Sequence, residues 1–222
     1  MTILNMGEHH SLPPHFCEMS YLSKADGSVF YTQGETAVLV GVFGPVQVMM
    51  KNERIEGATI EVTYKSKSGQ SGVDDRLKEL TINGVCESAI MSALHPRTGI
   101  TITIQEMQSH GGLLSACVNA CCMACMDAGI SMKYLFAAVD CGVRSNGDIV
   151  VGLDDKQDDI VGDVMYVFDS KNGGVLASES HGTISSQQLQ TALAIAKDVS
   201  AKLFDFYRNA IKKKFSKVVL PS

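Results

Sequence analysis

The chain has 222 residues, of which 45% are hydrophobic and 19% are charged, and this composition is typical of one globular α/β domain with a sizeable core. Its formal net charge of −5 excludes a protein that binds nucleic acid through an overall positive charge, so we expect any RNA contact to be local or shared. No stretch has the roughly 20 consecutive apolar residues of a membrane span, and the first 14 residues lack the apolar core of a signal peptide.

The first part of the chain predicts strands. Alternating or continuous apolar patterns over four segments favour this structure: 16–22, 28–32, 36–43 and 58–64. Ala25–Ser28 and Gly34-Glu35 are expected to form the turns between them. The continuous apolar run within 37–42 is typical of a central strand that is covered on both faces. We expect Gly44-Pro45 to end that strand, and leave open that 46–50 continues the sheet.

A helix is predicted after residue 72. Asp74 and Asp75 stand where acidic side chains favour a helix start. Apolar and small residues follow on two faces, one with Leu77 and Leu80 and the other with Ile82, so we expect the helix to be packed on two sides. After a break at 95–97, three isoleucines alternate with threonines over 100–104 and predict a half-buried strand.

The stretch 110–130 predicts a buried helix of roughly 16 residues, because its apolar residues leave no polar face. Asn119 is its one strongly polar interior residue and needs a hydrogen-bond partner. Gly129 suits the left-handed position after the last turn. Gly111 and Gly112 open the helix, and backbone N–H groups at such a start form an anion site.

Four cysteines lie in this predicted helix: Cys117, Cys121, Cys122 and Cys125. Thiols on one continuous helix point outward around its circumference, so they cannot converge on one zinc ion, which takes four tetrahedral ligands. We therefore interpret them as small hydrophobic core residues. The total of seven cysteines is odd and favours reduced thiols over a disulfide framework.

The remainder of the chain predicts further strands and a last helix. The expected strands are four: 135–143, 149–153, 164–168 and 175–180. Asn146-Gly147 predicts a hairpin turn, and 154–163 is expected to be an acidic loop. Ser185 and Gln188 form a capping box for the last helix, which ends in a lysine-rich tail. We expect one domain over 15–216, a mobile segment at 1–14 and a tail at 217–222.

Several of these segments together resemble the RNase PH family, and in particular the RNase PH-like subunits of the eukaryotic RNA exosome ring. The matching segments are Ala25–Ser28, Gly34–Pro45, His95–Thr98, Gly111–Cys125 and Phe206–Arg208. The resemblance spans nearly the whole chain. It implies an α/β (α+β) fold in which a mixed sheet packs with helices in βαβα order, similar to ribosomal protein S5 domain 2.

Active members of that family cleave RNA with inorganic phosphate, and the Thr and Arg of an Asp-Gly-Gly-Thr-Arg segment hold the phosphate. The matching positions here are His110, Gly111, Gly112, Leu113 and Leu114, so the resemblance implies that both ligands are lost. Ser115 is the only hydroxyl nearby.

The family's substrate-binding arginines match Val85 and Ser88, which carry no charge. We therefore expect a non-catalytic subunit with a degenerate phosphate pocket and no cofactor.

The resemblance also implies partners and a cellular role. We expect other RNase PH-like subunits and cap subunits of the exosome as neighbours, RNA in the pore that the ring frames, and no membrane. The expected role is support of 3′-to-5′ RNA processing and degradation, including rRNA maturation and mRNA turnover. The expected locations are the nucleus, nucleolus and cytoplasm.

An alternative function rests on the acidic loop. Its aspartates are Asp154, Asp155, Asp158, Asp159 and Asp163. Such a cluster indicates a divalent-metal (Mg²⁺) nuclease of RNA or DNA that acts as a homodimer outside the ring, with Asp154 and Asp158 as ligands. The resemblance separately implies that the family's paired catalytic aspartates match positions near these two residues. The loop does not fit a calcium-binding pattern, because Lys156 and Ile160 stand where ligands or glycine belong. A solvated acidic loop is the simpler interpretation.

Four basic residues are candidates for RNA contact: Lys65, Lys67, Arg76 and Lys78. Such side chains bind phosphates without reading sequence, although ordinary solvated surface lysines give the same pattern. The lysines at 212–217 are open to three interpretations: a nuclear-import signal, a phosphate contact, or a helix end favoured by the helix dipole.

Overall fold

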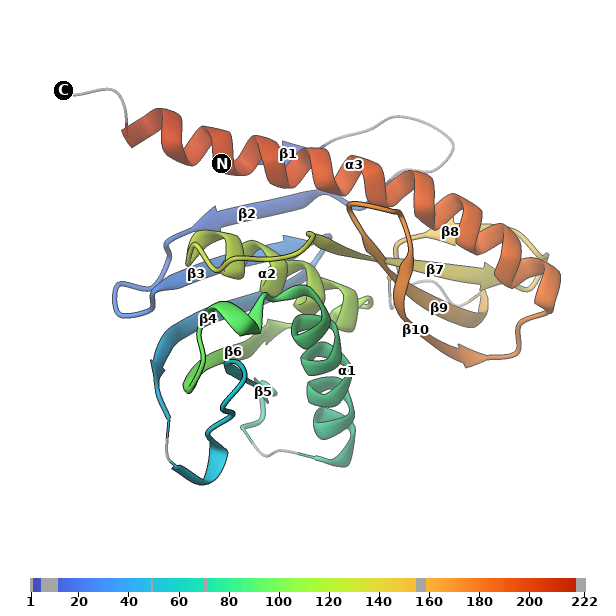
Figure 1. Ribbon diagram of the computed structural model, residues 1–222. Helices are drawn as coiled ribbons and strands as arrows, with labels where there is room; N and C mark the ends of the chain where they lie inside the picture. The colour runs from blue at the N-terminus through green and yellow to red at the C-terminus, as the bar shows by residue number, and fades with distance from the viewer. Residues whose placement is uncertain (1, 5–11, 49, 70–71, 155–158, 219–222) are drawn as a thin grey trace.

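The computed structural model describes residues 2–4, 12–48, 50–69, 72–154 and 159–218. In that part of the chain, ten strands form two sheets, and three α-helices pack between and along them (Figure 1). The helices are α1 (Val73–Ala89), α2 (Leu113–Asp127) and α3 (Ser186–Val218), with short 3₁₀ turns at Met50–Asn52 and Ser92–Leu94. No described helix is both long and apolar enough to span a bilayer.

The first sheet has six strands in the order β1-β2-β3-β4-β6-β5. Their bounds are β1 Thr2–Leu4, β2 His15–Met19, β3 Gly27–Gln33, β4 Thr36–Gln47, β5 Thr59–Lys65 and β6 Thr98–Gln108. Neighbouring strands are antiparallel except β5 and β6, which are parallel because α1 forms the crossover between them. The strand β4 continues past the cis Gly44-Pro45 bond with a shift of register, so our expectation that it ends there is wrong.

The second sheet has four antiparallel strands in the order β10-β9-β7-β8. Their bounds are β7 Phe136–Arg144, β8 Ile149–Val151, β9 Ile160–Asp169 and β10 Val175–Gly182. The expected mixed α/β fold is confirmed, but the strands divide into two sheets. The acidic loop is shorter than expected, because Asp163 lies in β9 and pairs with Gly142 and His181.

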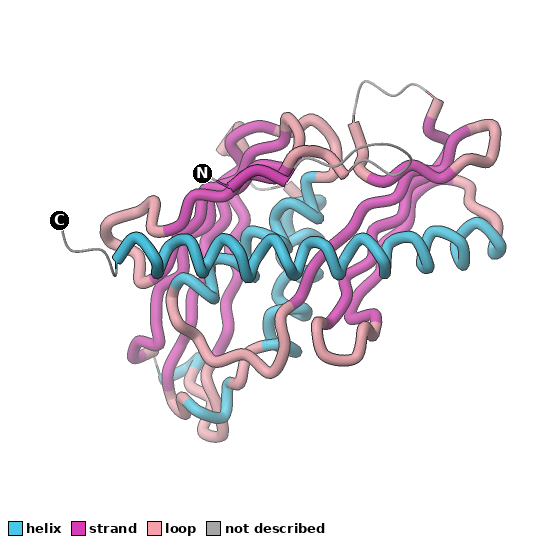
Figure 2. The backbone as a smooth tube through the Cα atoms, turned by 90° about the horizontal axis from the view of Figure 1, so that it is seen from above, coloured by secondary structure: helices cyan, strands magenta, loops and turns pink. Residues whose placement is uncertain are grey.

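The helix α2 lies at the centre of the molecule and packs against β3 and β4 of the first sheet and β7 of the second. All of its residues from Ser115 to Cys125 are buried. Figure 2 shows α3 running along both sheets, so the two halves of the chain share one core. Gly129 has the expected left-handed φ of 70°.

The helix α1 is buried on one face only. Asp75 Oδ2 accepts the N–H of Gly72 at 3.0 Å, which confirms the expected acidic start. The face that contains Ile82 and Val85 is buried, whereas Leu77 and Leu80 are 53% and 69% exposed. The expectation that both faces pack is therefore wrong within this chain.

The ends of the chain are more regular than expected. Thr2–Leu4 pairs with β2 inside the segment expected to be mobile, and 5–11 lie outside the described residues. The helix α3 continues to Val218, so Lys212–Lys214 are helical rather than part of a tail. The capping box is confirmed, because Ser185 N–H donates to Gln188 Oε1 at 2.9 Å.

All seven cysteines are free and buried. Burial raises the pKa of the Cys117 and Cys122 thiols to about 12, so they stay protonated. Among the described residues, no three His, Cys, Asp or Glu side chains are placed to share a metal ion. The four cysteines of α2 therefore pack as hydrophobic residues, as predicted.

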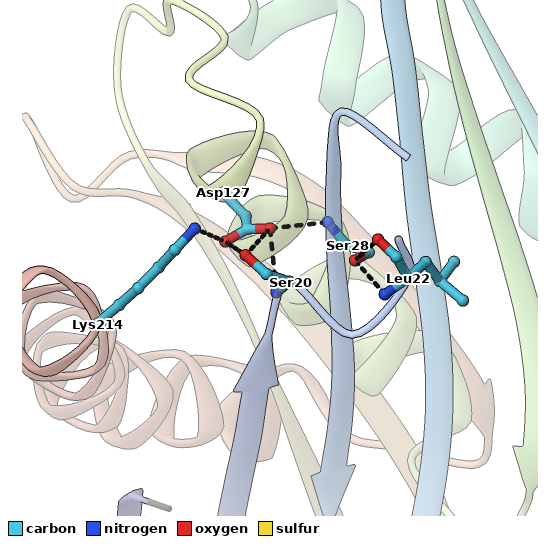
Figure 3. Close-up of polar contacts among 5 residues, drawn as sticks. All are labelled: Ser20, Leu22, Ser28, Asp127 and Lys214. Atoms are coloured by element: carbon cyan, nitrogen blue, oxygen red, sulfur yellow. Dashed lines mark hydrogen bonds and ion pairs between the residues drawn. The ribbon is translucent and has the colours of Figure 1, made fainter. Parts of the chain in front are cut away.

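A carboxylate at the C-terminal end of α2 holds three separate parts of the chain together (Figure 3). Asp127 has a side chain only 2% exposed and forms an ion pair with Lys214 of α3. It also accepts the backbone N–H groups of Ser20, at 3.2 Å, and of Ser28, at 2.9 Å. A carboxylate here faces the negative end of the helix dipole, so these donors and the lysine offset an unfavourable position.

The Ala25–Ser28 segment is explained by this contact. A Cβ on Gly27 would lie 2.3 Å from the backbone nitrogen of Ala128, so only glycine allows β3 to approach the end of α2. Asp26 Oδ2 accepts the N–H of Gly44 at 2.8 Å. The segment therefore determines how β3 packs against the end of α2.

Replacing Asp127 tests this junction. We expect Asp127→Ala to lower the free energy of unfolding by about 3 kcal/mol, because the N–H groups of Ser20 and Ser28 and the ammonium group of Lys214 lose their acceptor. Lys214→Met should cost less, about 1 kcal/mol, since the serine N–H groups still satisfy the carboxylate. Denaturant unfolding measures both changes. Asp205→Ala, which removes an exposed ion pair with Arg208, is the control and should cost less than about 0.5 kcal/mol. Equal losses of stability in all three variants would contradict the stabilising role of Asp127.

Candidate functional site

The candidate site is the N-terminal end of α2, which two glycines form. Gly111 has φ 89° and Gly112 has φ 59°, in the left-handed region that favours glycine. A Cβ on Gly111 would lie 2.7 Å from the carbonyl oxygen of Leu153, and one on Gly112 would lie 2.5 Å from Asp140 Oδ2. Close packing on both sides therefore also requires glycine here.

The loop before the helix is fixed by Thr36 at the start of β4. The Thr36 hydroxyl donates to the carbonyl of Gly111 at 2.7 Å and accepts the N–H of His110 at 2.9 Å. Thr36 is fully buried. Gly34-Glu35-Thr36 belongs to one of the segments that carry the family resemblance, and its Thr36 positions the start of α2.

Ser115 does not face a ligand from this position. Its side chain is fully buried, and its hydroxyl bonds to Asp140 Oδ2 and to the carbonyl of Gly112, the latter at 2.9 Å. Gln33 Nε2 donates to the same hydroxyl at 3.0 Å. The Ser115 hydroxyl, like that of Thr36, is therefore engaged inside the protein.

Asp140 is the residue that the sequence reasoning missed. It lies in β7, is 4% exposed, and its carboxyl group sits directly beneath the glycine start of α2. Burial raises its pKa to about 7, and the hydrogen bonds from Ser115 and Gln33 oppose that rise. An acidic residue inside an otherwise apolar strand is an unusual signal that would have identified it.

The polar network continues along α2 to Asn119, which has the partners that its burial requires. Its Oδ1 accepts the N–H of Ala138 at 2.7 Å and the hydroxyl of Tyr207 at 2.8 Å, and its Nδ2 donates to the Ala138 carbonyl at 3.0 Å. Tyr207 belongs to the Phe206–Arg208 segment of the resemblance. That segment therefore ties α3 to the central helix.

His15 is a second buried titratable group and lies near Asp140. His15 Nδ1 is 2.8 Å from the hydroxyl of Tyr31, and burial lowers the pKa of His15 to about 4. A small cavity of about 10 Å³ is lined by His15, Gln33 and Asp140 among others. The two ionisable groups therefore share one interior polar region.

The positions that matched phosphate and substrate ligands are apolar or uncharged. Leu113 and Leu114 are half-buried and pack against the core, Val85 is buried, and the Ser88 hydroxyl donates to the Val85 carbonyl at 2.7 Å. The start of the acidic loop is close by, since a Cβ on Gly111 would lie 3.1 Å from the Cα of Asp154. Asp158 lies outside the described residues.

The candidate RNA contacts gather around the connection from β5 to α1. Lys65, Lys67 and Arg76 are exposed there. Lys78 is partly engaged, because its Nζ lies 5.0 Å from the centre of the Tyr64 ring and 3.7 Å from Asp75 Oδ1. The structure thus brings the four side chains to one region, separate in sequence from the glycine loop.

Comparison with known proteins places this chain in a family. The model of the 3′ exoribonuclease family, domain 1 (RNase PH), matches residues 12–131. The chain belongs to the RNase PH family. This finding confirms the resemblance drawn from the short motifs and agrees with the two-sheet fold around α2.

Similar RNase PH proteins cover almost the whole chain. The exosome complex exonuclease RRP46 homolog of Oryza sativa subsp. japonica is 28% identical over 221 residues, which are 92% of this chain and 93% of that protein. The exosome complex component rrp46 of Schizosaccharomyces pombe is 32% identical over 202 residues, covering 85% and 89%.

Solved structures share the fold. The crystal structure of rice Rrp46 has a TM-score of 0.88 at 30% identity and covers 93% of this chain and 98% of its own. The Archaeoglobus fulgidus exosome with RNA bound to the active site has a TM-score of 0.76 at 16% identity, covering 87% and 88%. The second likeness concerns the fold alone.

The raised pKa of Asp140 predicts a pH-dependent stability. An unfolded aspartate ionises near its ordinary pKa of about 3.9, whereas folded Asp140 keeps its proton to about pH 7. The folded state therefore binds more protons between these values, and Asp140 lowers stability as the pH rises through that window. Asp140→Asn abolishes the effect, so its free energy of unfolding relative to wild type should rise by up to about 4 kcal/mol from pH 4 to pH 7.

The comparison uses urea unfolding of both proteins across this range. His15 acts in the opposite direction, because its lowered pKa makes stability increase as the pH rises from about 4 to 6.5, and so the wild-type curve alone is not diagnostic. Asp163 contributes a repulsive charge that also raises the pKa of Asp140 and remains in both proteins. A difference between the two proteins that stays constant with pH would show that Asp140 is ionised throughout.

Proposed function

We propose that this chain is a non-catalytic structural subunit of an RNA exosome ring. In that role it supports 3′-to-5′ processing and degradation of RNA, including rRNA maturation and mRNA turnover. The single observation that carries the proposal is the start of α2. There the chain keeps the glycines of a phosphate-binding loop, but Leu113 and Leu114 stand in place of the two ligands and Ser115 bonds inward to Asp140.

The energetic cost of these substitutions supports the absence of phosphorolysis. A donor that stabilises developing negative charge contributes about 3–4 kcal/mol of transition-state stabilisation, and two ligand positions here are leucine. The uncharged Val85 and Ser88 remove further positive charge. When Asp140 is ionised, its carboxylate beneath the glycines also repels an incoming phosphate.

The assembly role rests on the likeness to whole exosome subunits. The rice and fission yeast relatives named above are described as exosome complex proteins, and their length matches that of this chain. We propose other RNase PH-like subunits and cap subunits as its neighbours, RNA in the pore as its contact, and the nucleus, nucleolus and cytoplasm as its locations. Lys65, Lys67 and Arg76 are exposed and available as phosphate contacts in that setting.

A second candidate function is a divalent-metal (Mg²⁺) nuclease that acts as a homodimer outside the ring. The observation that favours it is the position of Asp154, whose backbone packs directly against Gly111 and so places the first residue of the acidic loop at the start of α2. In this case Asp154 and Asp158 would be the metal ligands. Acidic oxygen ligands suit Mg²⁺, which gives the proposal a chemical basis.

Phosphorolysis by the purified chain tests the first proposal. Incubated with single-stranded RNA and inorganic phosphate, the chain should release no nucleoside diphosphate above the background without phosphate, because the phosphate has no cationic or hydroxyl ligand at the glycine loop. An active RNase PH enzyme in the same buffer is the positive control. Phosphate-dependent release at a rate similar to that of the control enzyme would overturn the proposal.

The metal-dependent alternative predicts a different outcome. Magnesium should then support cleavage of RNA or DNA without phosphate, and Asp154→Ala combined with Asp158→Ala should abolish it. Cleavage that survives both substitutions would exclude these residues as ligands, and a lack of cleavage by the wild-type homodimer would exclude the activity.

A further inference from the structure

The strand β5 lies at the edge of the six-stranded sheet (Figure 1). It pairs with β6 on one side, from Thr59 beside Gly99 to Lys65 beside Gln105. No strand in the described part of the chain pairs with its other side. An edge of this kind presents backbone N–H and C=O groups that another strand can bind.

The direction of these backbone groups follows from two side-chain contacts. The N–H of Tyr64 points away from β6, because it donates to Glu79 Oε1 of α1 at 2.7 Å. The carbonyl of Lys65 points toward β6, where it accepts Gln105 Nε2 at 3.4 Å. Since backbone groups alternate along a strand, Ile60 and Val62 direct both their N–H and C=O groups to the open edge.

An open groove of about 320 Å³ runs between this edge and α1. Ile60 and Val62 line it on the strand, and Leu80 and Asn83 line it on the helix. Asn83 Oδ1 is buried and has no hydrogen-bond partner among the described residues. A buried acceptor without a donor is costly, so the groove has a vacant position for an N–H group.

The helix beside the groove carries an exposed apolar stripe. Val73, Leu77 and Leu80 are 86%, 53% and 69% exposed and follow one another at intervals of four and three residues. This spacing places them on one face of α1. The sequence predicts that Leu77 and Leu80 are packed, and within this chain they are not.

The charges around the groove favour a polypeptide over RNA. Glu61 and Glu79 line the groove itself together with one cation, Arg76, whereas Lys65 and Lys67 lie outside its lining at the connection from β5 to α1. The resulting negative balance repels a phosphate backbone. It does not oppose the neutral backbone of an extended peptide.

We propose that the β5 edge and the Val73–Leu77–Leu80 stripe form a docking surface for an extended strand of another protein subunit. The strand pairs with the outward backbone groups of Ile60 and Val62, and its apolar side chains cover Leu77 and Leu80. One N–H donor of that subunit binds Asn83 Oδ1. The identity of this partner as a subunit of the exosome ring rests on the proposed function; the strand-addition geometry rests on the contacts above.

Assembly with the other ring subunits tests the surface. The wild-type chain and the double variant Leu77→Glu/Leu80→Glu are each co-expressed with those subunits, and their affinity for the purified partner complex is measured. We expect the double variant to bind about tenfold more weakly or worse, because both leucines leave the apolar contact. Both positions are exposed, so the free variant should fold as the wild type does.

Phe215→Glu is the matched control. Phe215 is 60% exposed and belongs to α3, whose C-terminal end lies away from α1 in Figure 1. The substitution introduces one negative charge, against two in the double variant, at a similarly exposed apolar position and should leave the affinity unchanged. If the control weakens binding as much as the double variant, the apolar stripe of α1 is not a specific contact.

Hydrogen–deuterium exchange at single-residue resolution supplies an independent measurement on the backbone. In the free chain the amides of Ile60 and Val62 should exchange at least tenfold faster than those of Glu61 and Thr63, which face β6. In the wild-type complex Ile60 and Val62 should become protected. A complex that forms while these two amides still exchange rapidly overturns the docking surface and leaves the proposed function intact.

The remaining outcomes separate the alternatives. If the wild-type chain joins no ring complex, both the proposed function and this partner are overturned. Protection of Ile60 and Val62 in a homodimer of the chain alone assigns the edge to a second copy, and protection by single-stranded RNA alone assigns it to nucleic acid. Each of these two results overturns the proposed partner.

Discussion

The burial of α2 between the two sheets is the interaction on which the rest of the structure depends. Fully burying an aliphatic side chain contributes about 1.5–3 kcal/mol, and every residue from Ser115 to Cys125 is buried. Such a helix tolerates a polar side chain only if its hydrogen bonds are complete. Asn119 meets this condition through Ala138 of β7 and Tyr207 of α3, so it connects the central helix to the second sheet and to the last helix.

A carboxyl group lies at each end of α2, and the two groups are stabilised differently. At the start, Asp140 sits beneath the glycines, where the helix dipole favours negative charge but burial opposes it. At the end, the dipole is unfavourable, and Asp127 is held by backbone N–H groups and Lys214. Both ends of the central helix are therefore held by contacts within this chain.

The segments that carry the family resemblance are mostly contacts of this central helix. Gly27 and Ser28 meet its end, Thr36 positions its start, and Tyr207 binds its middle. These contacts form the fold whether or not a phosphate is bound. Leucines at positions 113 and 114 are therefore compatible with the same architecture, and for this reason we propose a structural role in a ring.

Much of this protein follows from the sequence by itself. The absence of a polar face predicts that α2 is buried, and the buried position of Asn119 predicts that it has hydrogen-bond partners. The glycines predict a left-handed backbone before the helix. All three are local properties of the chain. The motifs also predict the family, which the family model confirms, and the loss of phosphate ligands at Leu113 and Leu114, which stays a prediction.

Other features depend on which elements meet in space. The division into two sheets, the role of Asp140 and the exposure of Leu77 and Leu80 were all decided by tertiary structure. An apolar pattern shows that a face avoids water without showing what covers it, and a carboxyl group acquires its pKa from neighbours that are remote in sequence. For the same reason the open edge of β5 became visible only when its single partner strand was known.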